Sequence, residues 1–169
     1  MVKCSPKVIY LDLDGTVWSS RDISSQTPPF KKIGDFEIVD SNGLVVRLKP
    51  GVLEFLKWAK NTGLKVYSLS WNIPEIAYAA LKAFGIYGLF DGHCIEFHSH
   101  KGKMMKKAFE KYKLDVKPCE IVYVDDRRIH LNEVLREIGD VVFIQMNVDV
   151  KDFYDLKHVL EKMLREHDV

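Results

Sequence analysis

The chain has 169 residues, 47% of them hydrophobic, which is ordinary for a globular protein of single-domain length. Its 25 basic and 24 acidic residues leave a net charge of +1, so the overall charge does not favour nucleic acid as a partner. No stretch approaches the roughly 20 apolar residues that cross a membrane, and the N-terminus lacks the long apolar region of a signal peptide. We therefore expect a cytoplasmic protein, a single domain over residues 1–169, that binds neither nucleic acid nor membranes.

The three cysteines, Cys4, Cys94 and Cys119, are widely spaced and odd in number. They contain no C-x-x-C pair, so the spacing favours neither a zinc site nor a disulfide framework. We expect reduced, mostly buried thiols in a reducing compartment.

Short, nearly continuous apolar runs alternate with helical patterns along the chain. Such runs are typical of parallel strands, because both faces of a parallel sheet are covered. Taken in chain order, the expected elements are strand 8–13, helix 52–60, strand 64–69, helix 76–84, a weaker strand 94–97, helix 104–112, strand 121–124, helix 129–138, strand 141–146 and helix 153–164. This alternation predicts an α/β fold, a Rossmann-like three-layer αβα sandwich around a central parallel sheet.

Residues 17–48 interrupt this alternation directly after the first strand. The segment contains Pro28-Pro29 and two apolar runs on either side of Asn42-Gly43. Asn-Gly between such runs is a strong signal for a β-hairpin. We predict a small loop and hairpin insert here, too short to form a large cap over a site.

Two aspartates, Asp12 and Asp14, follow the first strand. Ligands of an open α/β sheet bind beyond the carboxyl ends of its strands, so this is where chemistry is expected. Side chains at i and i+2 of an extended chain point the same way, and two carboxylates held this close repel each other. A bound cation would relieve that repulsion.

Other strand ends supply matching groups. Ser70, followed by Trp71, lies at the end of the second predicted strand, and Asp125 and Asp126 end the fourth. Several aspartates together suit Mg²⁺, a hard cation that prefers oxygen ligands. A lysine near them would suit a phosphate group, and Lys101 and Lys103 lie in the intervening segment, the two candidates for this role.

These residues resemble the four motifs of the haloacid dehalogenase superfamily, whose members are mostly phosphatases. The matches, in order, are Asp12-Leu13-Asp14-Gly15-Thr16, Ser70, Lys103 and Asp125-Asp126. A closer resemblance, to the magnesium-dependent phosphatase-1 family, rests on Asp12-Leu13-Asp14 with Thr16-Val17-Trp18, on Pro28-Pro29-Phe30, and on Arg47-Leu48 with Pro50, as well as on Asp125-Asp126. Two positions depart from that family: Gly15, where it has tyrosine, and Trp71, where it has arginine.

The resemblance implies a magnesium-dependent phosphomonoesterase that acts on a phosphoprotein, including phosphotyrosine, or on a sugar phosphate. It implies that Asp12 is a nucleophile forming an aspartyl-phosphate and that Asp14 is the general acid and base. The implied substrate-binding residues are Thr16, Ser70, Trp71 and Lys103, with Lys103 also catalytic. The implied Mg²⁺ ligands are Asp12, Asp14 through its backbone carbonyl, and Asp126.

Several alternatives stay open at this point. Lys101 could replace Lys103, although the distance of Lys103 from Asp125 in the sequence fits the family better. Asp125 could replace Asp126 as the metal ligand, and His130 or Asn132 could support the metal. A receiver-like phosphoacceptor domain, a phosphomutase and a dehalogenase are the alternative functions. The order of the motifs disfavours a receiver-like domain, and the lack of a large cap disfavours a phosphomutase. The presence of Asp14 disfavours a dehalogenase.

Overall fold

The computed structural model describes residues 4–166, so the two ends of the predicted domain lie outside the described residues. Its centre is a five-stranded parallel sheet in the order β6-β5-β1-β7-β8. The strands are β1 (Val8–Leu11), β5 (Lys65–Trp71), β6 (Gly92–Glu96), β7 (Ile121–Asp125) and β8 (Val142–Gln145). All five predicted sheet strands are present, and each of their bounds lies within two residues of the predicted one.

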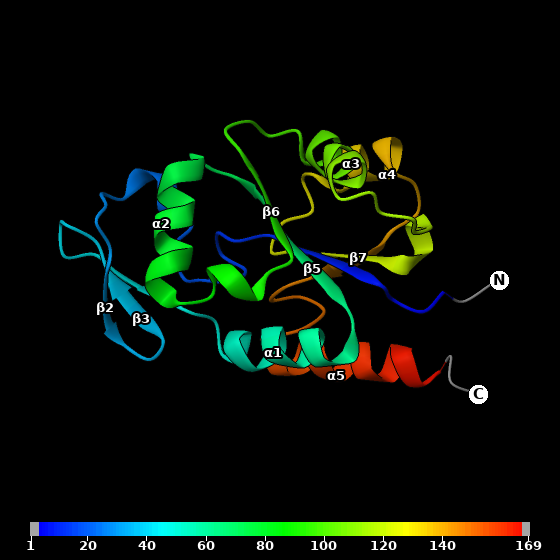
Figure 1. The fold of residues 1–169 in the computed structure, drawn as a ribbon, viewed down its shortest axis with the longest axis horizontal. Helices are drawn as coiled ribbons and strands as arrows, with labels where there is room; N and C mark the ends of the chain where they lie inside the picture. The colour runs from blue at the N-terminus through cyan, green and yellow to red at the C-terminus, as the bar shows by residue number, and fades with distance from the viewer. Residues whose placement is uncertain (1–3, 167–169) are drawn as a thin grey trace.

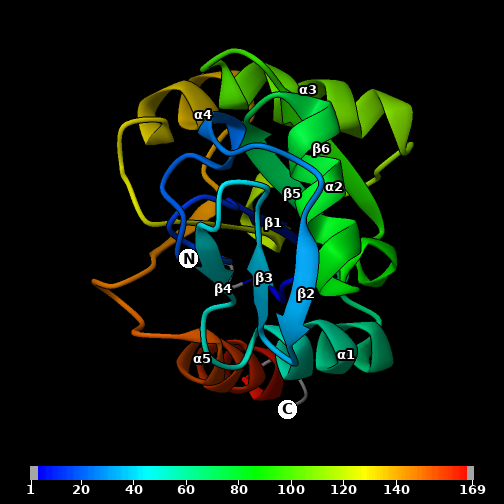
Figure 2. The same ribbon diagram turned by 90° about the vertical axis from the view of Figure 1, so that its left-hand side faces the viewer.

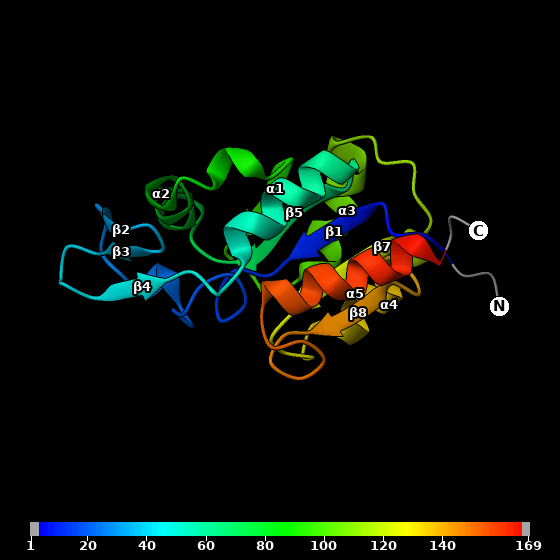
Figure 3. The ribbon, with the colours of Figure 1, turned by 90° about the horizontal axis from the view of Figure 1, so that it is seen from below.

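Helices cover both faces of this sheet (Figure 1, Figure 3). On one face lie α1 (Val52–Thr62) and α5 (Phe153–Arg165), and on the other lie α3 (Lys101–Lys111) and α4 (Leu131–Glu137). The helix α2 (Pro74–Phe84) packs between the sheet and the insert, while short 3₁₀ turns span Ile23–Ser25, Tyr87–Leu89 and Pro118–Glu120. The predicted three-layer αβα fold is therefore confirmed.

Alternation along the central strands divides the core into two clusters. Ile9 and Leu11 of β1 pack with α1, α2 and α5, whereas Val8 and Tyr10 pack with α3 and α4. All four residues of β1 are buried, because both faces of a central parallel strand are covered by helices. This burial holds the carboxyl end of β1, and therefore Asp12, in a rigid frame.

The insert forms a small antiparallel sheet of its own, in the order β2-β3-β4 (Figure 2). The predicted hairpin around Asn42-Gly43 joins β3 (Glu37–Val39) to β4 (Val45–Arg47). The third strand, β2 (Lys31–Gly34), was not predicted, because all four of its residues are exposed and it shows no apolar run. In Figure 1 the insert and α2 lie at the end of the molecule toward which β1 runs.

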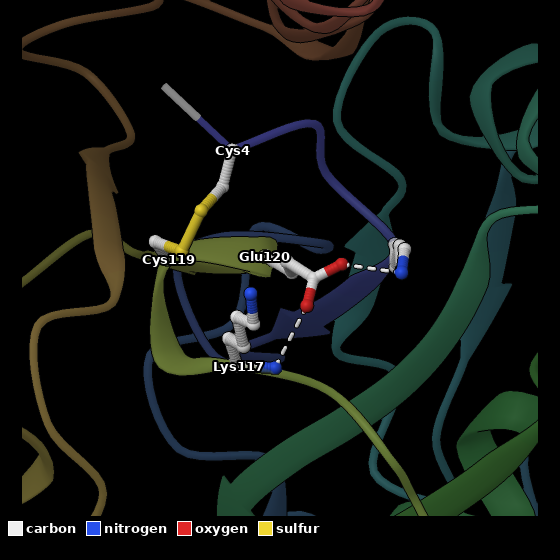
Figure 4. The surroundings of a disulfide bond; sticks show 5 residues. Cys4, Lys117, Cys119 and Glu120 are labelled. Atoms are coloured by element: carbon white, nitrogen blue, oxygen red, sulfur yellow. Dashed lines mark hydrogen bonds and ion pairs between the residues drawn. A yellow bond between two sulfur atoms is a disulfide. The ribbon is translucent and has the colours of Figure 1, made fainter. Parts of the chain in front are cut away.

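The prediction of three reduced cysteines is wrong. Cys4 and Cys119 form a disulfide across 115 residues of sequence, and only Cys94 is a free thiol among the described residues (Figure 4). Cys4 precedes β1 and Cys119 precedes β7, and these strands are neighbours in the sheet, so their Cα atoms lie 5.5 Å apart. Cysteine spacing along the chain carries no trace of this sheet order. The predicted cytoplasmic location loses the support that reduced thiols would have lent it.

Polar contacts reinforce the same junction. Glu120 lies beside the disulfide and accepts a hydrogen bond from the Lys117 amide at 2.9 Å (Figure 4). Its other oxygen forms an ion pair with Lys7 at 2.5 Å, just before β1. The segments that lead into β1 and β7 are therefore joined covalently and electrostatically.

Within residues 4–166, no helix is both long and apolar enough to span a membrane.

Candidate active site

Asp12 lies one residue beyond β1 and is almost fully buried. Its amide donates to the Val124 carbonyl at 2.9 Å, which continues the pairing of β1 with β7 past the end of the strand. One carboxylate oxygen accepts a hydrogen bond from the Thr16 hydroxyl at 2.8 Å, and the other lies 2.7 Å from the Lys101 ammonium. Each carboxylate oxygen retains a lone-pair direction for a further partner.

Of the two candidate lysines, the structure brings Lys101 rather than Lys103 to Asp12. Lys101, the first residue of α3, is 2% exposed and lies 2.7 Å from both Asp12 and Asp125. Lys103 is exposed on the same helix. Because successive helical residues are rotated by about 100°, residues two apart face nearly opposite sides, so only one of the two lysines can point into the site.

Asp125, the last residue of β7, anchors this lysine. One of its oxygens accepts hydrogen bonds from Lys101 and from the Tyr123 hydroxyl, and the other accepts from the Arg127 amide at 3.0 Å. Burial alone would raise the pKa of Asp125, but the Lys101 charge and these hydrogen bonds outweigh it and hold the pKa below its usual value. The carboxylates of Asp12 and Asp125 raise the pKa of Lys101 despite its burial. The pair is therefore ionised.

Oxygen atoms of Asp12, Asp125 and Asp126 lie within 4.8 Å of one another, the one such acidic group among the residues that the structure describes. Carboxylates are suitable ligands for Mg²⁺, so the residues present fit this ion. Asp126 is also the nearest neighbour of Gly15: a Cβ at that position would lie 2.5 Å from its carboxylate. Gly15 has φ +73°, a further reason why this turn takes glycine rather than tyrosine.

Asp14 is held by three donors. Its Oδ1 accepts from the Trp18 indole at 2.9 Å and from the Ile23 amide at 3.1 Å, and its Oδ2 accepts from the Asn72 amide group at 3.0 Å. Burial raises the pKa of Asp14, although these hydrogen bonds oppose the shift. A raised pKa increases the fraction of this carboxyl that carries a proton, as a general acid needs.

Asn72 links Asp14 to two other parts of the site. The residue is fully buried, donates to the Ser70 hydroxyl at 2.7 Å, and accepts a hydrogen bond from Ser24 in the insert. Ser24 in turn accepts from the Ile73 amide at 2.8 Å. Neither Asn72 nor Trp18 stood among the predicted site residues, since their hydrogen bonds with Asp14 depend on how the chain folds around it. The one available signal was their position in the sequence, since Trp18 comes shortly after the first motif and Asn72 shortly after Ser70.

The remaining predicted residues differ in exposure. Ser70 is buried at the end of β5, while Trp71 is 45% exposed. His130 is buried, and its Nε2 has no hydrogen-bond partner among the described residues, whereas Asn132 is exposed on α4. Burial, with the nearby Lys101 charge, lowers the pKa of His130. Of the two candidates, His130 is therefore the buried one, and it lies near Lys101 and Asp125.

The site combines two aspartates after β1, a lysine from α3 and an acidic pair at the end of β7. This combination defines the phosphatases of the haloacid dehalogenase class, as the resemblance implied. The chain belongs to the acid phosphatase family, whose model matches residues 4–150. It is therefore a phosphatase.

The chain is similar to one phosphatase in sequence, and two solved structures share its fold. The chain is 26% identical to human magnesium-dependent phosphatase 1 over 149 residues, which is 86% of this chain and 82% of the relative. An uncharacterized protein from Listeria monocytogenes has the same fold, with a TM-score of 0.63 at 16% identity over 94% of this chain and 99% of that one. A haloacid dehalogenase-like hydrolase from Streptococcus pneumoniae matches with a TM-score of 0.59 at 16% identity, covering 83% and 84% of the two chains.

Proposed function

We propose that this chain is a magnesium-dependent phosphomonoesterase that acts through an aspartyl-phosphate on Asp12. The observation that carries the proposal is the position of Asp12, a buried carboxylate 2.7 Å from Lys101 and within 4.8 Å of the neighbouring aspartates. Burial raises the pKa of Asp12 well above its usual value, and the Lys101 charge opposes this shift only in part. A cation bound beside the carboxylate would lower the pKa further and favour the ionised nucleophile. The name of the human relative supports magnesium as the cofactor.

Two chemical steps follow from this arrangement. A carboxylate oxygen of Asp12 forms a bond to phosphorus while the bond to the leaving-group oxygen breaks, and Asp14 gives its proton to that oxygen. A water molecule then attacks phosphorus and passes a proton back to Asp14, while the bond between phosphorus and Asp12 breaks. Lys101 offsets negative charge on both Asp12 and the phosphate. Ser70 and Thr16 supply hydroxyl groups at the phosphate site.

Magnesium would be held by the carboxylates of Asp12 and Asp126, with the Asp14 carbonyl as a third ligand. Asp125 is the weaker candidate, because its oxygens already accept from Lys101, Tyr123 and the Arg127 amide. When bound, the ion would supply positive charge that offsets the repulsion between an anionic nucleophile and a phosphate. The substrate is a phosphate ester, either a phosphoprotein or a small ester such as a sugar phosphate. One domain over residues 1–169 would carry the whole reaction.

Removing the metal should abolish activity, and adding Mg²⁺ should stabilise the folded chain. We expect hydrolysis of para-nitrophenyl phosphate to stop after dialysis against a chelator and to return when Mg²⁺ is added. A ligand that binds only the folded state raises its melting temperature, so Mg²⁺ should stabilise the wild-type chain. Asp126→Asn should remove this stabilisation, and Asp35→Asn, in an exposed turn of the insert, should keep it. Full activity in excess chelator would contradict the metal role.

Asp14→Asn should affect aryl and alkyl phosphates differently. An aryl leaving group hardly needs a proton, so its first step should slow only modestly, whereas an alkyl ester should lose much more of the roughly 10²–10⁴-fold assistance of a general acid. Hydrolysis of the aspartyl-phosphate needs a base for any substrate, so the variant should show a burst of nitrophenolate.

Rapid-quench kinetics with acid-trapped phosphoenzyme measures both effects. The isosteric change keeps the backbone carbonyl of Asp14, and Mg²⁺ stabilisation serves as the control for an intact metal site. Equal losses on aryl and alkyl esters without a burst would remove Asp14 from the acid–base role.

A further inference from the structure

A hollow of about 340 Å³ opens beside Asp14 at the carboxyl ends of β5, β6 and β7. Seven residues line this leaving-group hollow: Asp14, Arg21, Asp22, Ser24, Trp71, Phe97 and Arg127. Its volume is within the range of small-molecule sites. A general acid contacts the leaving-group oxygen, so, if Asp14 has the role proposed above, the space that it lines receives the leaving group.

Two aromatic side chains are exposed on the walls of this hollow. Trp71 is 45% exposed although it ends β5, whose preceding residues are mostly buried. Phe97, which directly follows β6, is 68% exposed. The last pair of the register between β5 and β6 is Trp71 with Glu96, so Phe97 is the first residue beyond the end of the neighbouring strand. A single exposed apolar side chain is ordinary, but two large rings at the mouth of a polar site are suited to covering an apolar, planar group.

Two guanidinium groups complete the hollow. Arg21 and Arg127 are both exposed, and neither forms an ion pair with another residue between 4 and 166. The lining contains two acidic side chains, Asp14 and Asp22. The Asp14 carboxylate already accepts three hydrogen bonds from other residues. A guanidinium offers paired donors that match carboxylate and phosphate oxygens. The hollow therefore combines apolar walls with uncommitted positive charge.

We propose that the leaving-group hollow takes phosphate monoesters whose leaving group is an aromatic ring bearing a second anionic group. The ring lies against Trp71 and Phe97, and the second anion lies toward the two arginines. This inference rests on the proposed phosphomonoesterase function and assigns its substrate class.

Three esters test this assignment: para-(carboxymethyl)phenyl phosphate, para-(hydroxyethyl)phenyl phosphate and glycerol phosphate. The two aryl esters share a ring and a similar leaving group but differ in charge, while the third lacks the ring. Each variant is compared with the wild-type chain on the same ester, so differences in leaving-group acidity cancel. The measured quantity is kcat/KM with saturating Mg²⁺.

We expect Trp71→Ala and Phe97→Ala to lower kcat/KM for both aryl esters about 3- to 10-fold more than for glycerol phosphate. The double variant Arg21→Gln, Arg127→Gln should lower kcat/KM for the carboxymethyl ester about 3- to 10-fold more than for its neutral partner. Phe36→Ala, an exposed aromatic of the insert, and Arg128→Gln, whose guanidinium lies over Phe143, are the matched controls. Trp71→Phe should recover most of the aryl preference.

Equal losses on all three esters, or no loss, would overturn the aromatic subsite. Equal losses of the arginine variant on both aryl esters would overturn the anionic part. Failure of the wild-type chain to hydrolyse any of the three esters with Mg²⁺ would contradict the phosphomonoesterase function, and the subsite with it. Hydrolysis with unchanged ratios would contradict the subsite alone.

Discussion

Asp12→Asn is expected to reduce kcat more than about 100-fold, a loss of at least roughly 2.7 kcal/mol of transition-state stabilisation. A carboxamide is a far poorer nucleophile than a carboxylate, so the covalent step loses its attacking group. The substitution also replaces the anion that pairs with Lys101 and that we propose as a metal ligand. The fold should survive, because the amide has the same shape and its oxygen can still accept from Thr16.

Steady-state and single-turnover kinetics with para-nitrophenyl phosphate measure this effect. Acid-trapped phosphoenzyme should form with the wild-type chain and be absent from the variant. Thermal unfolding separates a chemical defect from a folding defect, since a folded but inactive chain is the expected outcome. A variant that keeps more than a hundredth of the wild-type kcat would argue against covalent catalysis by Asp12.

Lys101→Ala is expected to cost far more activity than Lys103→Ala, by about 100-fold or more in kcat/KM. Lys101 is buried between Asp12 and Asp125, and removing one partner of a buried ion pair leaves uncompensated charge that costs about 3–5 kcal/mol. Part of that cost should appear as a lower melting temperature. Lys103 is exposed on the opposite side of α3, and its loss should change kcat/KM less than about threefold.

A second variant separates activity from stability in this comparison. Lys101→Met keeps the length and apolar stem of the side chain while removing its charge, so it should fold better than the alanine variant and remain as inactive. A larger loss for Lys103→Ala than for either Lys101 variant would return the phosphate lysine to position 103.

The local pattern of apolar and turn-forming residues was sufficient to predict the secondary structure of the central sheet and of the insert's hairpin. Continuous apolar runs predicted the five sheet strands, and Asn42-Gly43 predicted the hairpin of the insert, since both depend on neighbouring residues. The same holds for the aspartates: Asp12 and Asp14 follow β1 and Asp126 follows β7, and the carboxyl ends of parallel strands meet at one edge. A strand assignment alone was enough to expect an acidic, metal-binding edge.

The choice between lysines required the tertiary structure. Lys101 and Lys103 are two residues apart and chemically identical, and the rotation of α3 against the sheet decides which of them faces Asp12. The same applies to the groups that hold Asp14. Trp18 follows Asp14 by four residues, but Asn72 is 58 residues away from it. Asp14 and Asn72 meet because β1 and β5 are neighbours in the sheet.

The disulfide shows the same limit. Composition and spacing predicted reduced thiols, yet Cys4 and Cys119 meet because β1 and β7 lie side by side. The sequence by itself determined which elements form and which end of the sheet carries the chemistry, because these depend on short-range periodicity. Which distant side chains touch there depends on strand order and helix rotation, which arise from packing of the whole core, and only the tertiary structure decided them.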